Sequence, residues 1–274
     1  MIPLLIIGAG VAGLTLARRT GAPVLEKSRG VGGRLATRRI GEERFDHGLQ
    51  AWPEDKVCRE VFSGTAGPQG ITAIAKALAE GVDVRKEERA RRLVQISGGW
   101  RVETDKGEHL ARQVALSAPV PQALELLAAS DLPTRPEWQL PYDKALVGLF
   151  LLDARKPSDA SFERAGHALH FQGEKDLAAT GVTLIASAQF SELHFEDEDT
   201  KNLQRLKGLL AELLGERNLK HAELKKWRYS RARLAHELPY LEAAPGLFLF
   251  GDGFLTPTVA GAIRSAQELA RRLS

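Results

Sequence analysis

The chain has 274 residues, of which 43% are hydrophobic and 27% charged. This composition excludes a disordered chain, a fibrous repeat and a disulfide-stapled miniprotein. The 38 basic and 35 acidic residues leave a formal charge of +3, too small to predict binding to nucleic acid or to a membrane. The single cysteine, Cys58, excludes an intramolecular disulfide and a multi-cysteine metal site, and we predict no metal.

The apolar start of the chain, residues 1–17, is interrupted by three glycines and lacks a basic beginning, unlike a signal peptide. No apolar run reaches the roughly 18–20 residues of a membrane span. We therefore expect a cytoplasmic protein.

The first 26 residues predict a strand at 3–7, a glycine-rich turn, a short helix and a second strand at 23–25. Apolar spacing then predicts a helix at 70–80, and turns separate short strands that suggest a meander before a helix at 119–129. These strands are 82–85, 92–96, 100–104 and 113–117.

Three prolines in residues 131–141 mark a change in composition. Strands are predicted beyond it at 145–152, 168–172, 182–189 and 223–229, with a long amphipathic helix at 198–214 among them. A buried strand at 247–250 and a helix at 258–273 close the chain.

These elements predict an α/β fold with a three-layer, Rossmann-like domain and a smaller antiparallel-sheet domain inserted into it. The Rossmann-like domain is discontinuous, formed by residues 1–130 and 235–274. The inserted domain, residues 131–234, is expected to meet a substrate.

The turn after the first strand carries glycines at positions 8, 10 and 13. Gly8 permits a tight turn, Gly10 lets backbone approach a pyrophosphate, and Gly13 allows helix and strand to pack closely. Glu26 ends the second strand, where an acid accepts hydrogen bonds from a ribose. It lies 13 residues after Gly13, fewer than usual, which predicts an altered adenosine end. The alternative is a glycine-rich turn in an ordinary α/β protein.

The loop at 26–34 is rich in glycine and basic residues. Such a loop brings amides close to a second diphosphate face, where Arg34 or Arg29 neutralises phosphate charge through a planar fork. The alternative is a solvated basic loop.

Two further segments point to a flat ring system. In residues 45–52, Gly48 allows close approach, and Gln50 or Trp52 could face the ring; the alternative is a turn with a core tryptophan. After the strand at 247–250, Asp252 can accept from polyol hydroxyls, and the last helix directs its N-terminus at an electron-rich edge. The alternative is a plain capping turn.

Together these segments resemble the FAD-dependent amine-oxidase superfamily, and more narrowly renalase and its bacterial relatives. The resemblance is carried by residues 6–13, 26–34, 45–52, 116–121, 226–229 and 251–262. It implies a flavoprotein with an FAD-binding domain and a noncovalent FAD in an extended pose. It also implies oxidase activity on a misreduced isomer of NAD(P)H, a dihydropyridine that gives up a hydride, with O2 as the electron acceptor.

Carried over residue by residue, the resemblance implies three groups of cofactor contacts. The pyrophosphate and adenosine end would be held by Gly8, Gly10, Val11, Ala12, Gly13, Glu26, Lys27, Ser28, Arg29 and the Ala90 backbone. The diphosphate and ribityl chain would be held by Gly33, Arg34 and Asp252. The ring would be met by His47, Gly48, Gln50, Ala260, Gly261 and Ala262.

No acid–base constellation is evident, which suits oxidation of a dihydropyridine. The pocket candidates are Trp52, Tyr142, Phe171, Gln189, Trp227 and Tyr229. Two alternatives remain. One is another flavin enzyme, an amine oxidase or a desaturase of a small substrate; amine oxidation usually needs an aromatic cage, and no Tyr or Trp is near residues 251–262 in the sequence. The other is a non-enzymatic protein that binds FAD or NAD.

Overall fold

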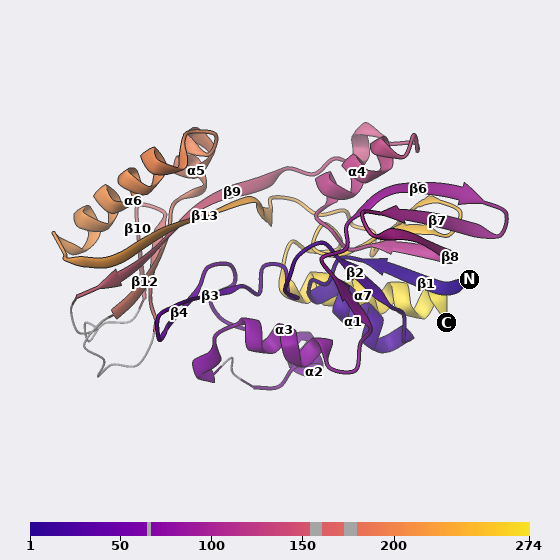
Figure 1. Ribbon diagram of the computed structural model, residues 1–274, viewed down its shortest axis with the longest axis horizontal. Coiled ribbons are helices and arrows are strands. Elements are labelled where there is room, and N and C mark those ends of the chain that lie inside the picture. The colour runs from indigo at the N-terminus through magenta and orange to yellow at the C-terminus, as the bar shows by residue number, and fades with distance from the viewer. Residues whose placement is uncertain (65–66, 154–160, 173–179) are drawn as a thin grey trace.

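The computed structural model describes residues 1–64, 67–153, 161–172 and 180–274. It contains two large sheets at opposite ends of the molecule, with a small hairpin between them (Figure 1). The strands before the inserted region are β1 (Ile2–Ile7), β2 (Val24–Glu26), β3 (Thr37–Ile40), β4 (Glu43–Asp46), β5 (Val84–Lys86), β6 (Ala90–Ile96), β7 (Gly99–Thr104) and β8 (Gly107–Leu116). The later strands are β9 (Tyr142–Leu152), β10 (Phe162–Arg164), β11 (His167–Gln172), β12 (Thr180–Ile185), β13 (Leu219–Ala232), β14 (Leu241–Ala244) and β15 (Leu247–Leu249).

The α-helices are α1 (Val11–Thr20), α2 (Lys56–Val61), α3 (Thr72–Ala79), α4 (Val120–Ala129), α5 (Ala188–His194), α6 (Asp199–Leu214) and α7 (Val259–Leu273). Two short 3₁₀ helices are η1 (Gly67–Gln69) and η2 (Pro136–Trp138).

The first sheet has the strand order β14-β15-β8-β1-β2-β5. Its members β15, β8, β1, β2 and β5 run parallel, while β14 is antiparallel to β15, and β7 and β6 extend from β8 as the predicted meander. Because β2 and β8 flank β1 on opposite sides, the order reverses between β1 and β8. Ligands of open α/β sheets bind at such a switch point, outside the carboxyl ends of the strands.

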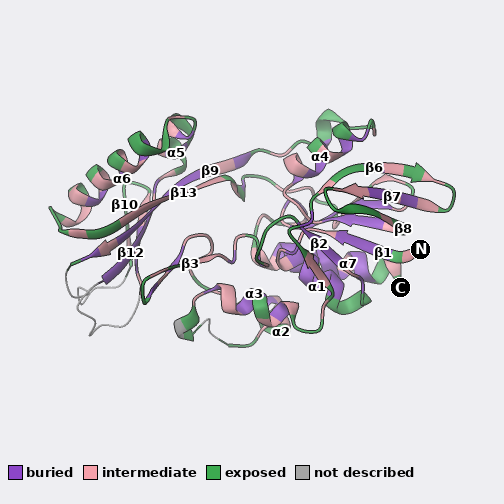
Figure 2. Ribbon diagram, viewed as in Figure 1, coloured by how far each residue is buried: buried purple, intermediate pink, exposed green. Residues whose placement is uncertain are grey.

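Helices and the meander cover the two faces of this sheet, which confirms the predicted three-layer, Rossmann-like fold. On one face Leu4 and Ile6 pack against α1, α3 and α7. On the other face Leu5 and Leu25 pack against the meander and α4. Buried residues accordingly concentrate on the inner strands (Figure 2).

The second sheet is antiparallel, with the order β10-β11-β12-β9-β13. One face buries Leu146 and Phe150 under α6, and the other buries Val147 and Leu149 against Phe45 of β4. All five strands lie within residues 142–232, inside the predicted inserted domain. The domain boundaries themselves remain a prediction.

The predicted strand at 182–189 is wrong at its end. The strand stops at Ile185, and the Ser187 hydroxyl accepts a hydrogen bond from the Phe190 amide at 3.2 Å to cap α5. Serine is a preferred N-cap because its oxygen satisfies an amide of the first helical turn. The β3–β4 hairpin, which the sequence analysis did not predict, lies between the two sheets and contacts the second through Phe45 (Figure 1).

Candidate functional site

The glycine-rich turn after β1 contains two glycines that are required for packing and one that is not. Gly8 has a φ of +107°, a conformation that favours glycine. A Cβ at Gly13 would lie 1.9 Å from the Gly8 carbonyl oxygen. A Cβ at Gly10, in contrast, would meet nothing within 4 Å. The absence of a side chain at Gly10 therefore leaves open space rather than close packing.

A second loop borders this open space. Gly32 forms a bridge with Gly10, and a Cβ at Gly33 would meet only the Gly10 Cα, at 3.7 Å. Helix α1 begins here with Gly10 as its N-cap, and in the described residues its first turn has neither a side-chain cap nor an acidic residue. The amides of Val11 and Ala12 are in the first turn of α1 and have no acceptor within the helix. They therefore favour an anion at this helix N-terminus.

Glu26 closes one side of this region despite the short βαβ unit. Its side chain is buried, and its two oxygens accept hydrogen bonds from the amides of Ala9 and Ser28, each at 2.8 Å. Helix α1 ends at Thr20, where Gly21 adopts the left-handed conformation. The shortened helix therefore still brings the carboxylate to the glycine turn, and the remaining lone pairs can accept ribose hydroxyls.

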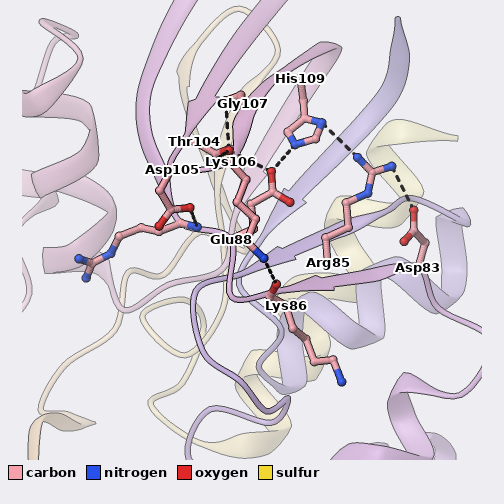
Figure 3. Close-up of polar contacts among 10 residues, drawn as sticks. Asp83, Arg85, Lys86, Glu88, Thr104, Asp105, Lys106, Gly107 and His109 are labelled. Carbon is pink, nitrogen blue, oxygen red and sulfur yellow. Dashed lines mark hydrogen bonds and ion pairs between the residues drawn. The ribbon is translucent and has the colours of Figure 1, made fainter.

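A polar network joins the loop between β5 and β6 to β7 and β8 (Figure 3). The Glu88 amide donates to the Glu26 carbonyl at 2.9 Å, and the Glu88 carboxylate meets His109 Nε2 at 2.6 Å and the Thr104 hydroxyl at 3.0 Å. Arg85 lies 3.1 Å from His109 Nδ1 and can only donate, so His109 carries its proton on Nε2. Burial opposes ionisation of Glu88, but the hydrogen bonds from His109 and Thr104 outweigh it and lower the pKa of that carboxyl.

The other predicted adenosine-end residues lie around this loop. Lys27 and Arg29 are exposed, and Lys27 Nζ donates to Gln122 Oε1 at 3.1 Å. Ala90 begins β6, where it pairs with Thr104. Their contacts with a cofactor remain predictions.

Arg34 and Asp252 form an ion pair that joins the two ends of the chain. Arg34 Nη1 lies 2.7 Å from Asp252 Oδ2 and 3.1 Å from the Ser230 carbonyl oxygen. The Tyr142 hydroxyl donates to Asp252 Oδ1 at 3.3 Å. Burial, followed by the charge of Asp252, raises the pKa of Tyr142, which therefore remains a donor at neutral pH.

We expect Asp252→Asn to lower the free energy of unfolding by about 1–2 kcal/mol, because it removes the partner of a partly buried guanidinium. Tyr142→Phe removes a hydroxyl that donates to Asp252 and accepts the buried Val120 amide at 3.3 Å, so it should cost a similar amount, about 1–2 kcal/mol. Urea denaturation of both variants measures the two costs. An Asp252→Asn variant as stable as the wild type would show that the ion pair contributes nothing to the fold.

Gly48 packs on the loop that carries Arg34. A Cβ at Gly48 would lie 2.1 Å from the Arg34 carbonyl oxygen, which accepts the Leu49 amide at 2.9 Å. The next polar side chain, Gln50, donates to the Asp46 carbonyl at 2.7 Å and accepts from Gln172 Nε2 at 3.2 Å. Gln172 belongs to β11, so this amide pair links the glycine segment to the antiparallel sheet.

His47 lies against the antiparallel sheet. Its ring stacks on Trp227 at a centroid distance of 5.5 Å, and Trp227 Nε1 donates to the His47 carbonyl at 2.7 Å. His47 Nδ1 is buried and has no hydrogen-bond partner in the described residues. Burial, with a further contribution from the charge of Lys225, lowers the pKa of His47 to about 4.

This lowered pKa makes stability depend on pH. An unfolded histidine titrates at about 6.5, so the unfolded chain binds more protons between pH 4 and 6.5. The contribution of neutral His47 to the free energy of unfolding is fully present above this window. It is lost as the pH falls through the window, by up to about 1.4 kcal/mol per pH unit. We expect His47→Gln to flatten this slope in urea denaturation. Equal slopes in His47→Gln and the wild type would refute the assignment.

The N-terminus of α7 is partly satisfied within the chain. The Gly261 amide donates to the Thr258 hydroxyl and the Ala262 amide to the Thr258 carbonyl, both at 3.0 Å. Two of the three amides at 260–262 therefore have partners within the chain, and the contact of these residues with a ring remains a prediction. A Cβ at Gly261 would lie 2.0 Å from the Thr256 carbonyl oxygen, so this glycine is required for the helix to begin.

Three of the six predicted pocket residues lie in the core, on an exposed helix or against the Phe62 ring. Phe171 is in the core beneath α6, because its side chain points to the helix-covered face of the sheet. Gln189 is exposed on α5. Trp52 donates from Nε1 to the Phe62 carbonyl at 3.2 Å and packs edge-on against the Phe62 ring.

The other three lie where the antiparallel sheet approaches the glycine segments. Trp227 contacts His47, and Tyr142 contacts Asp252. The Tyr229 ring lies edge-on to that of Tyr142 at 5.7 Å. The absence of a Tyr or Trp near residues 251–262 in the sequence therefore does not hold in the fold, because folding brings Tyr142 to Asp252.

Two supporting residues were missed in the sequence. The Ser117 hydroxyl donates to the Gly8 carbonyl at 2.8 Å, across the β1–β8 switch point. The Ser265 hydroxyl accepts the Gly251 amide at 2.9 Å. Both are ordinary small polar residues with no local pattern, and only their position after β8 or inside α7 gives them this role.

Comparisons with known proteins agree with this geometry. Residues 6–63 match the family model of the NAD(P)-binding Rossmann-like domain. The whole fold is similar to that of a provisionally assigned protoporphyrinogen oxidase from Exiguobacterium sp. 255-15, with a TM-score of 0.74, 13% identity and coverage of 99% of this chain and 98% of that one.

Two further structures are similar over the same shares of both chains, 99% and 98%. One is cyclohexylamine oxidase from Brevibacterium oxydans IH-35A, with a TM-score of 0.73 and 10% identity. The other is a putrescine oxidase double mutant with redesigned cofactor binding, with a TM-score of 0.67 and 12% identity. The chain therefore has the fold of these oxidases, built on a Rossmann-like domain.

In the described residues no helix is long and apolar enough to cross a membrane. Within the same ranges no group of three or more His, Cys, Asp or Glu side chains is placed to hold a metal ion.

Proposed function

We propose that the protein is an FAD-dependent oxidoreductase that binds its cofactor noncovalently. The observation that carries the proposal is the open space over Gly10 and Gly33, at the carboxyl ends of the parallel strands. Glu26 borders it on one side and the Arg34–Asp252 pair on the other. A dinucleotide needs this order of groups: an acid for the ribose, free amides for the pyrophosphate and a cation for its charge.

The residues of the chain would hold and orient the cofactor. The amides of Val11 and Ala12 would bind the diphosphate at the N-terminus of α1, and Glu26 would accept the adenosine ribose hydroxyls. Arg34 would neutralise the diphosphate while Asp252 keeps its guanidinium in place. Gly48 and Gln50 would lie beside the ring. A bound FAD would supply the redox chemistry, namely acceptance of a hydride from the substrate and, with one further proton from solvent, reduction of O2 to hydrogen peroxide.

For the substrate we propose a dihydropyridine, a misreduced isomer of NAD(P)H. Loss of one hydride leaves an aromatic pyridinium, so no protein base is needed. Both Nε2 hydrogens of Gln50 are bonded to backbone carbonyls, but Gln172 Nε2 gives only one hydrogen to Gln50, so its second can donate to a carboxamide. This arrangement supports a small polar substrate over a long apolar one.

An amine is the second candidate. Its support is the Tyr142–Tyr229 pair next to Asp252, which provides aromatic surface close to the proposed cofactor. The oxidases of putrescine and cyclohexylamine that share the fold act on amines.

Anaerobic mixing separates these candidates. FAD-loaded protein is mixed with the 2- and 6-dihydro isomers of NAD(P), with ordinary NAD(P)H as the control, and separately with putrescine and cyclohexylamine. Bleaching of the visible flavin absorbance by the dihydro isomers, reversed by air with formation of peroxide, is the expected result. Bleaching by an amine alone would transfer the assignment to amine oxidation. No bleaching by any of these compounds while FAD stays bound would reject both substrates.

A further inference from the structure

A hollow of about 330 Å³ lies beside the β3–β4 hairpin, on the side of η1 and α3. It is lined by Thr37, Arg39, Arg44, Gln69, Thr72 and Lys76. All three charged side chains of this lining are cationic, and they come from three different elements: β3, β4 and α3. We propose that the hollow binds a small, multiply charged oxyanion of the phosphate type.

The first argument is the pairing of like charges. Arg39 and Arg44 are directly opposite each other in the register of the hairpin. Like charges at opposite positions of an antiparallel pair destabilise it. A bound anion would remove this repulsion, since both guanidinium groups could then donate to the same ligand.

The second argument is that these cations form no ion pair within the part of the chain that the structure describes. Arg39 Nε donates to the Gly41 carbonyl at 3.0 Å, and Arg44 donates to the Glu42 carbonyl at 3.1 Å. Among the described residues, no carboxylate lies within ion-pair distance of Arg39, Arg44 or Lys76. The opposite face of the same hairpin differs, because Arg38 forms an ion pair with Glu223 at 3.1 Å.

The neighbouring polar groups are already engaged. Asp46 Oδ1 accepts the Thr37 hydroxyl at 2.5 Å and the Ile71 amide at 2.9 Å. The Thr72 hydroxyl donates to the Leu35 carbonyl at 3.1 Å. The donors left for a ligand are two guanidinium forks, one ammonium group and the Gln69 amide. Guanidinium forks match the geometry of phosphate oxygens, and Lys adds a point charge.

The size of the hollow favours a small molecule. Its volume is at the lower end of the range for small-ligand sites, about 300–1,000 Å³. The site is separate from the proposed cofactor cradle, because none of its lining residues belongs to the cradle; only the test rests on the proposed function, since it uses protein loaded with FAD. The oxyanion could be free or carried by a metabolite, and the experiment distinguishes the two.

The test is isothermal titration of the protein, saturated with FAD, with inorganic phosphate, pyrophosphate and ribose 5-phosphate. Saturation with FAD prevents the anions from occupying the diphosphate cradle, and flavin absorbance shows whether FAD is displaced. We expect Arg39→Gln and Arg44→Gln each to weaken binding about tenfold, since each removes a charge-assisted contact. Lys76→Gln should also weaken it. Arg38→Gln, the matched control on the opposite face, should leave the affinity unchanged.

A second readout distinguishes a binding site from a structural role. Without the anion, Arg39→Gln should raise the melting temperature, because it removes the repulsion from Arg44, and it should abolish the increase that the anion causes in the wild type. Tighter binding of ribose 5-phosphate than of the inorganic ions would assign the ligand to a phosphorylated metabolite, and the reverse to a free oxyanion. The proposal fails if no anion binds, if Arg38→Gln weakens binding as much as Arg39→Gln does, or if binding releases FAD.

Discussion

Gly13→Ala should destabilise the protein strongly, whereas Gly10→Val should leave it folded and unable to hold its cofactor well. The added Cβ at Gly13 would lie 1.9 Å from the Gly8 carbonyl oxygen, so β1 and α1 must separate. We expect a loss of at least about 3 kcal/mol in the free energy of unfolding, the upper part of the range for overpacking.

Gly10 has φ −78° and ψ −178°, which any residue can adopt, and its Cβ position is open. Valine there should fold normally and fill the space intended for the diphosphate, weakening FAD binding by about 10- to 100-fold. Urea denaturation and FAD titration of both variants measure the two effects. The account is contradicted if Gly10→Val unfolds like Gly13→Ala, or if it binds FAD with wild-type affinity.

Glu26→Gln should reduce both stability and cofactor affinity. Both carboxylate oxygens accept backbone amides at 2.8 Å, but glutamine has only one acceptor oxygen, so one amide would face an NH₂ group. A buried donor left without an acceptor costs about 1–3 kcal/mol. FAD affinity should fall by about 10- to 100-fold, because the ribose loses a charged acceptor.

Glu87→Gln is the matched control, since Glu87 is exposed in the adjacent loop. Denaturation and FAD titration of the two variants should differ clearly. Wild-type FAD affinity in Glu26→Gln would remove Glu26 from the cofactor site.

The sequence was sufficient for the parts of the fold that depend on local patterns. The glycine spacing and the apolar runs around it predicted β1, α1 and β2, and the turn residues predicted the β6–β7–β8 meander. The β3–β4 hairpin was not predicted because its strands are short and mostly polar, and because Phe45 and Ile40 pack against apolar residues of the other sheet. Its stability comes from tertiary contact rather than from alternation along the chain.

In the candidate site too, residues placed by a local pattern could be predicted, whereas contacts between distant segments could not. Glu26 and the glycines could be located because their roles follow from position within one βαβ unit. Arg34 and Asp252 were each predicted, but the ion pair between them spans 218 residues and has no local signal. Phe171 shows why the sequence was insufficient for the pocket: neighbouring residues of a strand point to opposite faces, so Phe171 lies in the core while Gln172 bonds to Gln50.

The most direct test of the central claim is titration of the purified protein, freed of any bound flavin, with FAD. The account predicts saturable binding of one FAD per chain, with release of intact FAD on denaturation because the attachment is noncovalent. It also predicts weaker binding of FMN, which lacks the adenosine that Glu26 would hold. A protein that rejects FAD, or binds FMN equally well, would contradict the account and leave the Rossmann-like domain to another dinucleotide or to a different role.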